Sequence, residues 1–103
     1  LLKMLVDSFQ QELHEIEQLI ELEDYPQLEH VLHRLYGATR YVGTPALQDV
    51  AGGFEQFVST LRKERRKADE AFVQETLNRA NELKVVMDQV KQVAQSILSK
   101  YEQ

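Results

Sequence analysis

Cysteine and tryptophan are absent from the 103-residue sequence, and proline occurs only twice. Without cysteine, neither a disulfide framework nor a thiolate metal site can form. Long apolar segments are also missing, because no run approaches the roughly 20 residues that a membrane-spanning helix needs. The chain does not open with the charged and apolar regions of a secretion signal. We therefore expect a cytoplasmic location and no membrane contact by this domain.

Acidic residues outnumber basic ones, which gives a formal net charge of -5. Nucleic-acid binders generally need a positive surface, so we expect no nucleic-acid partner. The length and the 43% hydrophobic content suit a single domain, residues 1–103, with one core. Because apolar residues recur at helical spacing from Leu1 onward without a preceding N-cap, we expect this domain to be a fragment of a longer protein.

Helical periodicity covers nearly the whole sequence, and no segment alternates as a strand does. The expected helices span about 1–23, 24–42, 45–61 and 69–99. Such elements with short connections predict an all-α fold, an antiparallel four-helix bundle.

Residues at the ends of these segments support the boundaries. Asp24 and Asp69 are suitable N-caps, and Thr44 followed by Pro45 is a typical helix start. Gly43 is expected to end the second helix in a left-handed conformation. The predicted core consists of apolar residues and one threonine at helical spacing: Leu2, Val6, Phe9, Leu13, Ile16, Ile20, Leu28, Val31, Leu32, Leu35, Thr39, Val42, Leu47, Val50, Ala51, Phe54, Val58, Leu61, Phe72, Val73, Leu77, Ala80, Leu83, Val86, Val90, Val93 and Ile97.

His33 lies on the polar side of the second helix. On a wheel of about 100° per residue, it is about 140° from Leu28, which marks the apolar face. Gly37 follows one turn later and Arg40 two turns later, both near the angle of His33. We therefore predict that the imidazole of His33 faces solvent, above a turn of helix without a side chain.

Gly37 costs about 1 kcal/mol relative to alanine inside a helix, and on the polar face it gains no core packing. A missing side chain one turn from an exposed imidazole lets another protein approach the ring closely, as phosphoryl transfer requires. Neutral imidazole is nucleophilic near neutral pH. Arg34 and Arg40 are candidates to hold phosphoryl oxygens.

The segment from His33 to Leu47 reads HRLYGATRYVGTPAL. It resembles the motif of histidine-containing phosphotransfer domains, His-x-Leu-x-Gly-Ala/Ser followed by Gly and Leu, and in particular the C-terminal module of BarA/GacS-type hybrid sensor kinases. The resemblance implies that His33 carries the phosphoryl group, Gly37 gives clearance and Arg34 stabilises the group.

The resemblance also implies that Glu55, on the following helix, hydrogen-bonds the other imidazole nitrogen and orients the ring. One departure from the family concerns charge, because members often have lysine where this chain has Tyr36. Arg40 is then the candidate to replace that lysine.

In function, the resemblance implies a phosphorelay intermediate that accepts the phosphoryl group from a receiver-domain aspartate and passes it to a response regulator. The partners are then receiver domains of the parent kinase and of the regulator. No cofactor is implied in this domain, since the partner receiver supplies Mg²⁺. The sequence has no glycine-rich phosphate loop or ATP site, so the domain is a carrier. The parent protein is expected to be a hybrid histidine kinase in a bacterial inner membrane.

Two other interpretations remain. The same face can dock a receiver without carrying phosphate, as a helical interaction module. Glu29, His30 and His33 are spaced for a surface metal site, but a predicted supporting ligand from another helix is lacking, so no metal is expected.

The basic stretch 62–67 fits either a solvated helix end or a surface that binds an acidic partner or anions.

Overall fold

The computed structural model describes residues 2–42, 45–64, 67 and 69–101. It contains four helices: α1 (Leu2–Glu21), α2 (Tyr25–Val42), α3 (Pro45–Lys63) and α4 (Glu70–Tyr101). No strand occurs in these ranges, which confirms the all-α prediction. Gly43 and Thr44, the expected end of one helix and start of the next, lie outside the described residues. No helix in the described chain is both long enough and apolar enough to cross a membrane.

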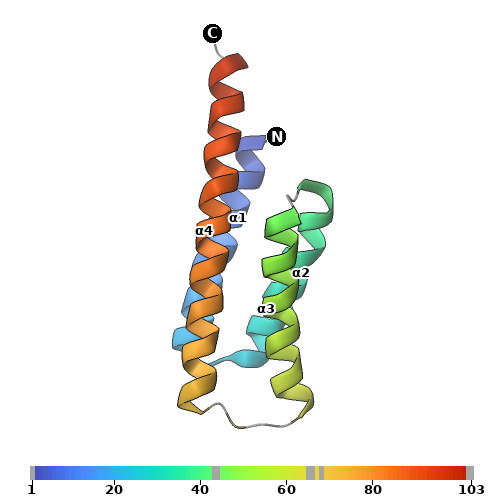
Figure 1. Ribbon diagram of the computed structural model, residues 1–103, viewed down its shortest axis with the longest axis vertical. Helices are drawn as coiled ribbons and strands as arrows, with labels where there is room; N and C mark the ends of the chain where they lie inside the picture. The colour runs from blue at the N-terminus through green and yellow to red at the C-terminus, as the bar shows by residue number, and fades with distance from the viewer. Residues whose placement is uncertain (1, 43–44, 65–66, 68, 102–103) are drawn as a thin grey trace.

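The helices form an up-and-down bundle (Figure 1). Each helix packs on two neighbours: α1 on α2 and α4, and α3 on α2 and α4. The start of α1 and the end of α4 reach beyond the ends of α2 and α3, so the molecule is elongated, 53 Å along its longest axis. The predicted four-helix bundle is thus confirmed.

The turn between α1 and α2 reverses the chain in three residues. Glu23 has a φ of 56°, and its amide donates to the carbonyl of Ile20 at 3.1 Å, while the amide of Asp24 donates to Leu19 at 3.0 Å. This pair of bonds is the Schellman arrangement that closes a helix, with glutamate at the position that glycine usually takes. As a result α1 ends at Glu21, two residues earlier than the sequence predicts.

Both predicted aspartate caps form. The Oδ1 atom of Asp24 accepts a hydrogen bond from the amide of Gln27 at 3.3 Å, and Oδ1 of Asp69 accepts one from the amide of Phe72 at 2.8 Å. Each bond satisfies an amide that the first helical turn leaves without a partner. The starts of α2 and α4 are therefore fixed by local chemistry.

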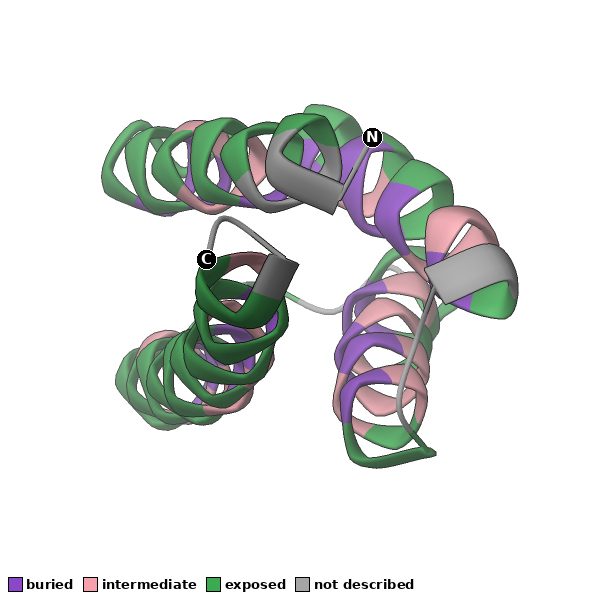
Figure 2. Cartoon of the chain, turned by 90° about the horizontal axis from the view of Figure 1, so that it is seen from above, coloured by how far each residue is buried: buried purple, intermediate pink, exposed green. Residues whose placement is uncertain are grey.

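The core lies between the four helices, where the buried residues face one another (Figure 2). The predicted core residues that are buried are these: Phe9, Ile16, Ile20, Leu28, Val31, Leu32, Leu35, Thr39, Leu47, Ala51, Phe54, Val58, Leu61, Phe72, Ala80 and Leu83. Leu13 and Val50 are partly buried against this cluster. The side chains of Leu2, Val6 and Val42 lie outside the described part of the structure.

The predicted face of α4 is wrong in part, because Leu77, Val93 and Ile97 are exposed. Thr76, Met87 and Ala94 are buried there instead. Thr76 and Ala94 share one angle on the helix wheel, and Leu77 and Val93 lie about 100° from it on opposite sides. Ile97 lies closer to that angle, but α4 here extends past the other helices (Figure 1). The buried face of α4 therefore does not follow its larger apolar side chains.

The buried face of α4 can be tested by comparing alanine substitutions at two of its leucines. Leu83 is fully buried, whereas Leu77 is 42% exposed. We expect Leu83→Ala to lower the free energy of unfolding by about 2 to 5 kcal/mol through lost burial and a cavity. We expect Leu77→Ala to change it by less than about 1 kcal/mol. Urea unfolding followed by circular dichroism measures both, and equal losses would contradict the assignment.

Candidate functional site

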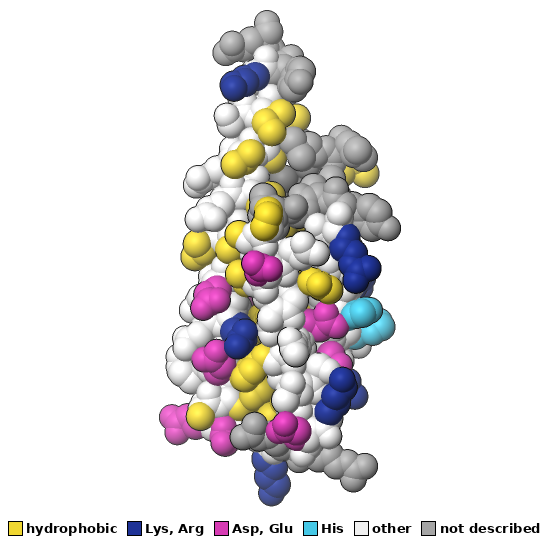
Figure 3. All heavy atoms as spheres, turned by 45° about the vertical axis from the view of Figure 1, so that its right-hand side comes forward, with side chains coloured by type: hydrophobic (Ala, Val, Ile, Leu, Met, Phe, Trp, Pro, Cys, Tyr) yellow, Lys and Arg dark blue, Asp and Glu magenta, His cyan; other side chains and the backbone are white. Residues whose placement is uncertain are grey.

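His33 projects from α2 into solvent, as the helical wheel predicts, with 75% of its side chain exposed. The buried residues on the opposite side of the helix fix this orientation, since Leu28, Leu32 and Leu35 are fully buried. Figure 3 shows histidine side chains on the surface, with acidic and basic side chains close by. An imidazole in this position is accessible to a second molecule.

Glu55 of α3 holds the ring of His33 from the side. Its Oε1 atom lies 2.7 Å from Nδ1 of His33, and only 21% of the Glu55 side chain is exposed. Its neighbour Phe54 is fully buried and Val58 lies one turn on in the core, which fixes the rotation of α3. A carboxylate only accepts hydrogen bonds, so Nδ1 is assigned the proton, and Nε2 of the neutral ring keeps its lone pair.

Gly37 is not required by the packing of the bundle. A Cβ atom built on it would meet no atom within 4 Å, apart from its own helix backbone and its chain neighbours. Gly52 of α3 differs, because a Cβ atom there would lie 2.8 Å from Cε2 of Tyr36. Gly37 and Gly52 thus have different explanations, since Gly52 makes room for a neighbouring ring while Gly37 leaves open space one turn after His33.

Tyr36 and Arg40 form a layer beside this open turn. The Tyr36 ring lies against α3 at Gly52, and the Arg40 guanidinium carbon is 5.7 Å from the centre of that ring, a distance at which a cation is attracted to the ring face. Arg40 is therefore positioned by Tyr36, the residue that stands where the resemblance led us to expect a lysine. The close approach at Gly52 was not predicted from the sequence, although the pair of adjacent glycines within a helical segment is a signal for one.

Arg34 points from α2 towards α1. Its Nε atom donates to Glu12 at 3.3 Å, and its Nη2 atom donates to Glu15 at 3.1 Å. Burial raises the pKa of the Glu12 carboxyl, and the charge of Arg34 beside it works in the opposite direction. The structure therefore pairs Arg34 with α1 and does not bring its guanidinium to the imidazole of His33.

A hollow of about 180 Å³ lies beside His33, and its lining residues come from α2 and α3: Pro26, Glu29, His30, His33, Glu55 and Arg62. Arg62 donates from Nη1 to Glu29 across the two helices. From the sequence, Arg62 belongs to a basic stretch that fits either a solvated helix end or a surface for an acidic partner or anions. Its contact with Glu29 depends on how α2 and α3 pack, for which the local sequence carries no signal.

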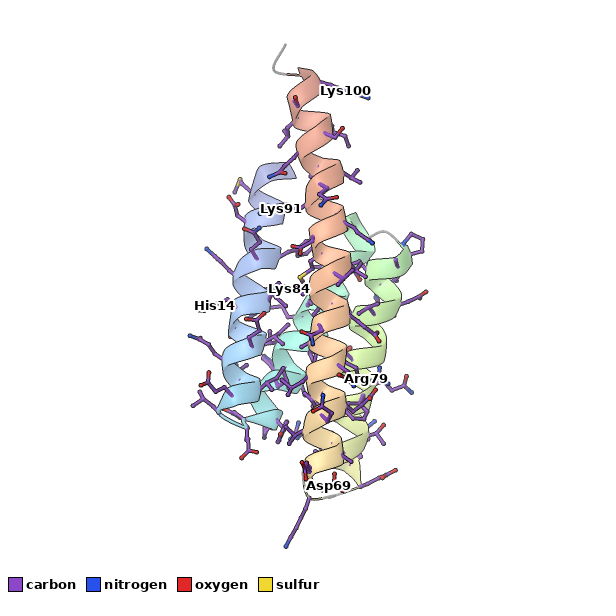
Figure 4. The ribbon with its side chains drawn as sticks, turned by 60° about the vertical axis from the view of Figure 1, so that its left-hand side comes forward. His14, Asp69, Arg79, Lys84, Lys91 and Lys100 are labelled. Atoms are coloured by element: carbon purple, nitrogen blue, oxygen red, sulfur yellow. The ribbon has the colours of Figure 1, made fainter. Side chains whose placement is uncertain are left out.

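No group of three or more histidine, aspartate or glutamate side chains in the described ranges could hold a metal ion. Glu29, from the metal set considered above, is bound to Arg62. His14 is separate from the site, exposed on α1 in the stick view of Figure 4, which also places Lys84, Lys91 and Lys100 along α4. The candidate site is an oriented imidazole beside open space.

The two glycines can be tested by alanine substitution. We expect Gly37→Ala to raise the free energy of unfolding by about 1 kcal/mol, because the methyl group enters open space and alanine favours the helix. We expect Gly52→Ala to stabilise less or to destabilise, since Tyr36 must move. Chemical unfolding of both variants gives the comparison. A Gly37→Ala protein less stable than the parent would mean that packing requires this glycine.

Comparison with known proteins provides one match. A family model described as the Hpt domain matches residues 1–97. Comparisons with curated proteins and with solved structures find no significant match. The matched range includes all of the site residues described above and nearly the whole bundle. The chain therefore belongs to the Hpt domain family, the histidine-containing phosphotransfer domains that serve as phosphotransfer intermediates in two-component signalling and work with receiver domains.

Proposed function

We propose that His33 is the phosphoryl carrier of this domain. It accepts the group from an aspartyl phosphate on a receiver domain of the parent kinase and passes it to the receiver of a response regulator. The observation that carries the proposal is the exposed imidazole whose Nδ1 atom lies 2.7 Å from Glu55. This contact leaves Nε2 free to act as the nucleophile.

In the proposed transfer, one bond to phosphorus forms as another breaks. The lone pair of Nε2 forms a bond to phosphorus as the bond from phosphorus to the aspartate oxygen breaks, and the aspartate leaves as a carboxylate with the electron pair. The proton on Nδ1 stays in place, so the ring becomes a phosphorylated imidazolium. Glu55 stabilises the positive charge that develops on this ring. The onward transfer to a second receiver runs through the same steps in reverse.

Gly37 and Arg40 serve the approach of the receiver. The open space over Gly37 lets the receiver bring the phosphorus of its aspartyl phosphate within bonding range of Nε2, with the leaving carboxylate oxygen in line on the far side of the phosphorus. Arg40, held over Tyr36, offers positive charge at the edge of this approach. The Mg²⁺ used in aspartyl phosphate chemistry is supplied by the receiver. The domain, residues 1–103, then works as one module of a larger hybrid sensor kinase.

Label transfer tests the carrier role. Incubation with a phosphorylated receiver should place acid-labile, alkali-stable label on the parent chain. The His33→Gln variant should take up none, and His14→Gln, which changes an exposed histidine of α1, should take up the parent amount. Absence of label on the parent chain, with the receiver still bound, would instead favour a docking module that carries no phosphate.

The role of the open space over Gly37 is tested by placing a larger side chain there. We expect Gly37→Gln to slow transfer on the order of tenfold to a hundredfold, because the added side chain displaces the receiver from its reactive position. The same variant should be at least as stable as the parent, since glutamine has a higher helix propensity than glycine. Quenched-flow transfer and urea unfolding measure the two effects. An unchanged transfer rate would refute this role for Gly37.

A further inference from the structure

One positive charge beside the site comes from α3. Of the four arginines whose placement the structure describes, Arg34 pairs with carboxylates of α1, Arg40 lies over a tyrosine ring and Arg79 lies over a phenylalanine ring of α3. Arg62 lines the same hollow as His33. The residue that the motif selects for charge stabilisation is therefore not the arginine that shares this hollow.

Two polar pairs cross from α2 to α3 at this hollow. His33 meets Glu55, and one turn earlier on α2, Glu29 meets Arg62. Residues four apart on a helix lie about 6 Å from one another on the same face. The guanidinium of Arg62 is held against Glu29 and thus lies roughly one helical turn from the place of His33. An arginine side chain spans such a distance by changing rotamers.

The ion pair between Arg62 and Glu29 can give way to a contact between Arg62 and another anion. The Arg62 side chain is 46% exposed and that of Glu29 is 23% exposed, and ion pairs in contact with solvent contribute little to stability. A phosphoryl group on Nε2 carries up to two negative charges and three acceptor oxygens, which match the fork of a guanidinium. Once His33 is phosphorylated, the phosphoryl group therefore competes strongly with the single carboxylate.

We propose that Arg62 binds the phosphoryl oxygens of phosphorylated His33, and that Glu29 holds Arg62 in the unphosphorylated chain. The inference deepens the proposed function, because it rests on phosphate residing at His33. Binding by Arg62 stabilises the dianionic form of the phosphoryl group. Glu29 weakens that binding because it competes for the same guanidinium, so the two residues together set how firmly the group is held.

The test uses phosphoramidate, which needs no receiver. Nε2 of His33 forms the bond to phosphorus as the phosphorus–nitrogen bond of phosphoramidate breaks and ammonia leaves. The ³¹P signal that disappears in His33→Gln identifies the phosphoryl group of His33, and its shift against pH gives the pKa of that group. We expect Arg62→Gln to raise this pKa by about 0.5 to 1, because a nearby cation favours the dianion. Arg34→Gln, whose guanidinium pairs with α1, is the matched control and should leave it unchanged.

Glu29→Gln releases Arg62, so it should lower the pKa of the phosphoryl group in the parent background. In the Arg62→Gln background this effect should largely vanish, because Glu29 acts through that guanidinium. An unchanged titration in Arg62→Gln, or an equal change in Arg34→Gln, would overturn the assignment of Arg62. If Glu29→Gln lowered the pKa as much in the Arg62→Gln background as in the parent, the proposal that Arg62 moves from Glu29 to the phosphoryl group would be overturned. If phosphoramidate labels His33 but receivers do not, the proposed function fails while this comparison still stands.

Discussion

The hydrogen bond between Nδ1 of His33 and Glu55 is the contact on which the proposed chemistry of this molecule depends. It joins two helices, fixes the plane of an exposed ring and leaves one ring nitrogen with a lone pair facing solvent. An imidazole exposed to this extent would otherwise sample several rotamers. One carboxylate therefore gives the exposed imidazole the defined direction that the proposed nucleophile needs.

This contact is in turn set by the core. His33 and Glu55 belong to helices whose opposite faces are buried, with Leu32 on α2 and Phe54 on α3 inaccessible to solvent. Rotation of either helix by one residue would move its polar side chain by about 100° and separate the pair. The stability of the bundle and the geometry of the site are therefore one property, because the same packing determines both.

The sequence predicted those features that follow from local pattern. Helical periodicity identified the four helices and the exposure of His33, and the caps at Asp24 and Asp69 followed from residue type alone. The buried face of α4 was harder to predict, because small or polar residues such as Thr76 occupy it while Leu77 is exposed.

Cross-helix contacts of long side chains could not be predicted from one sequence. Arg34 reaches carboxylates of α1, and Arg62 reaches Glu29 of α2, because of the rotation and spacing of packed helices. Glu55 was found only through the resemblance to phosphotransfer domains, since helix periodicity placed it no closer than the flank of its helix. The sequence therefore indicates which charged residues are candidates for ion pairs, and the packing of the helices determines which of them come into contact.

The most direct test of this account is ¹⁵N and ³¹P NMR of the phosphorylated chain with ¹⁵N-labelled histidine. The account predicts that phosphorus couples to Nε2 of His33 and that Nδ1 retains its proton against Glu55. Phosphorus bonded to Nδ1 would contradict it, because that nitrogen could not then donate to the carboxylate that orients the ring.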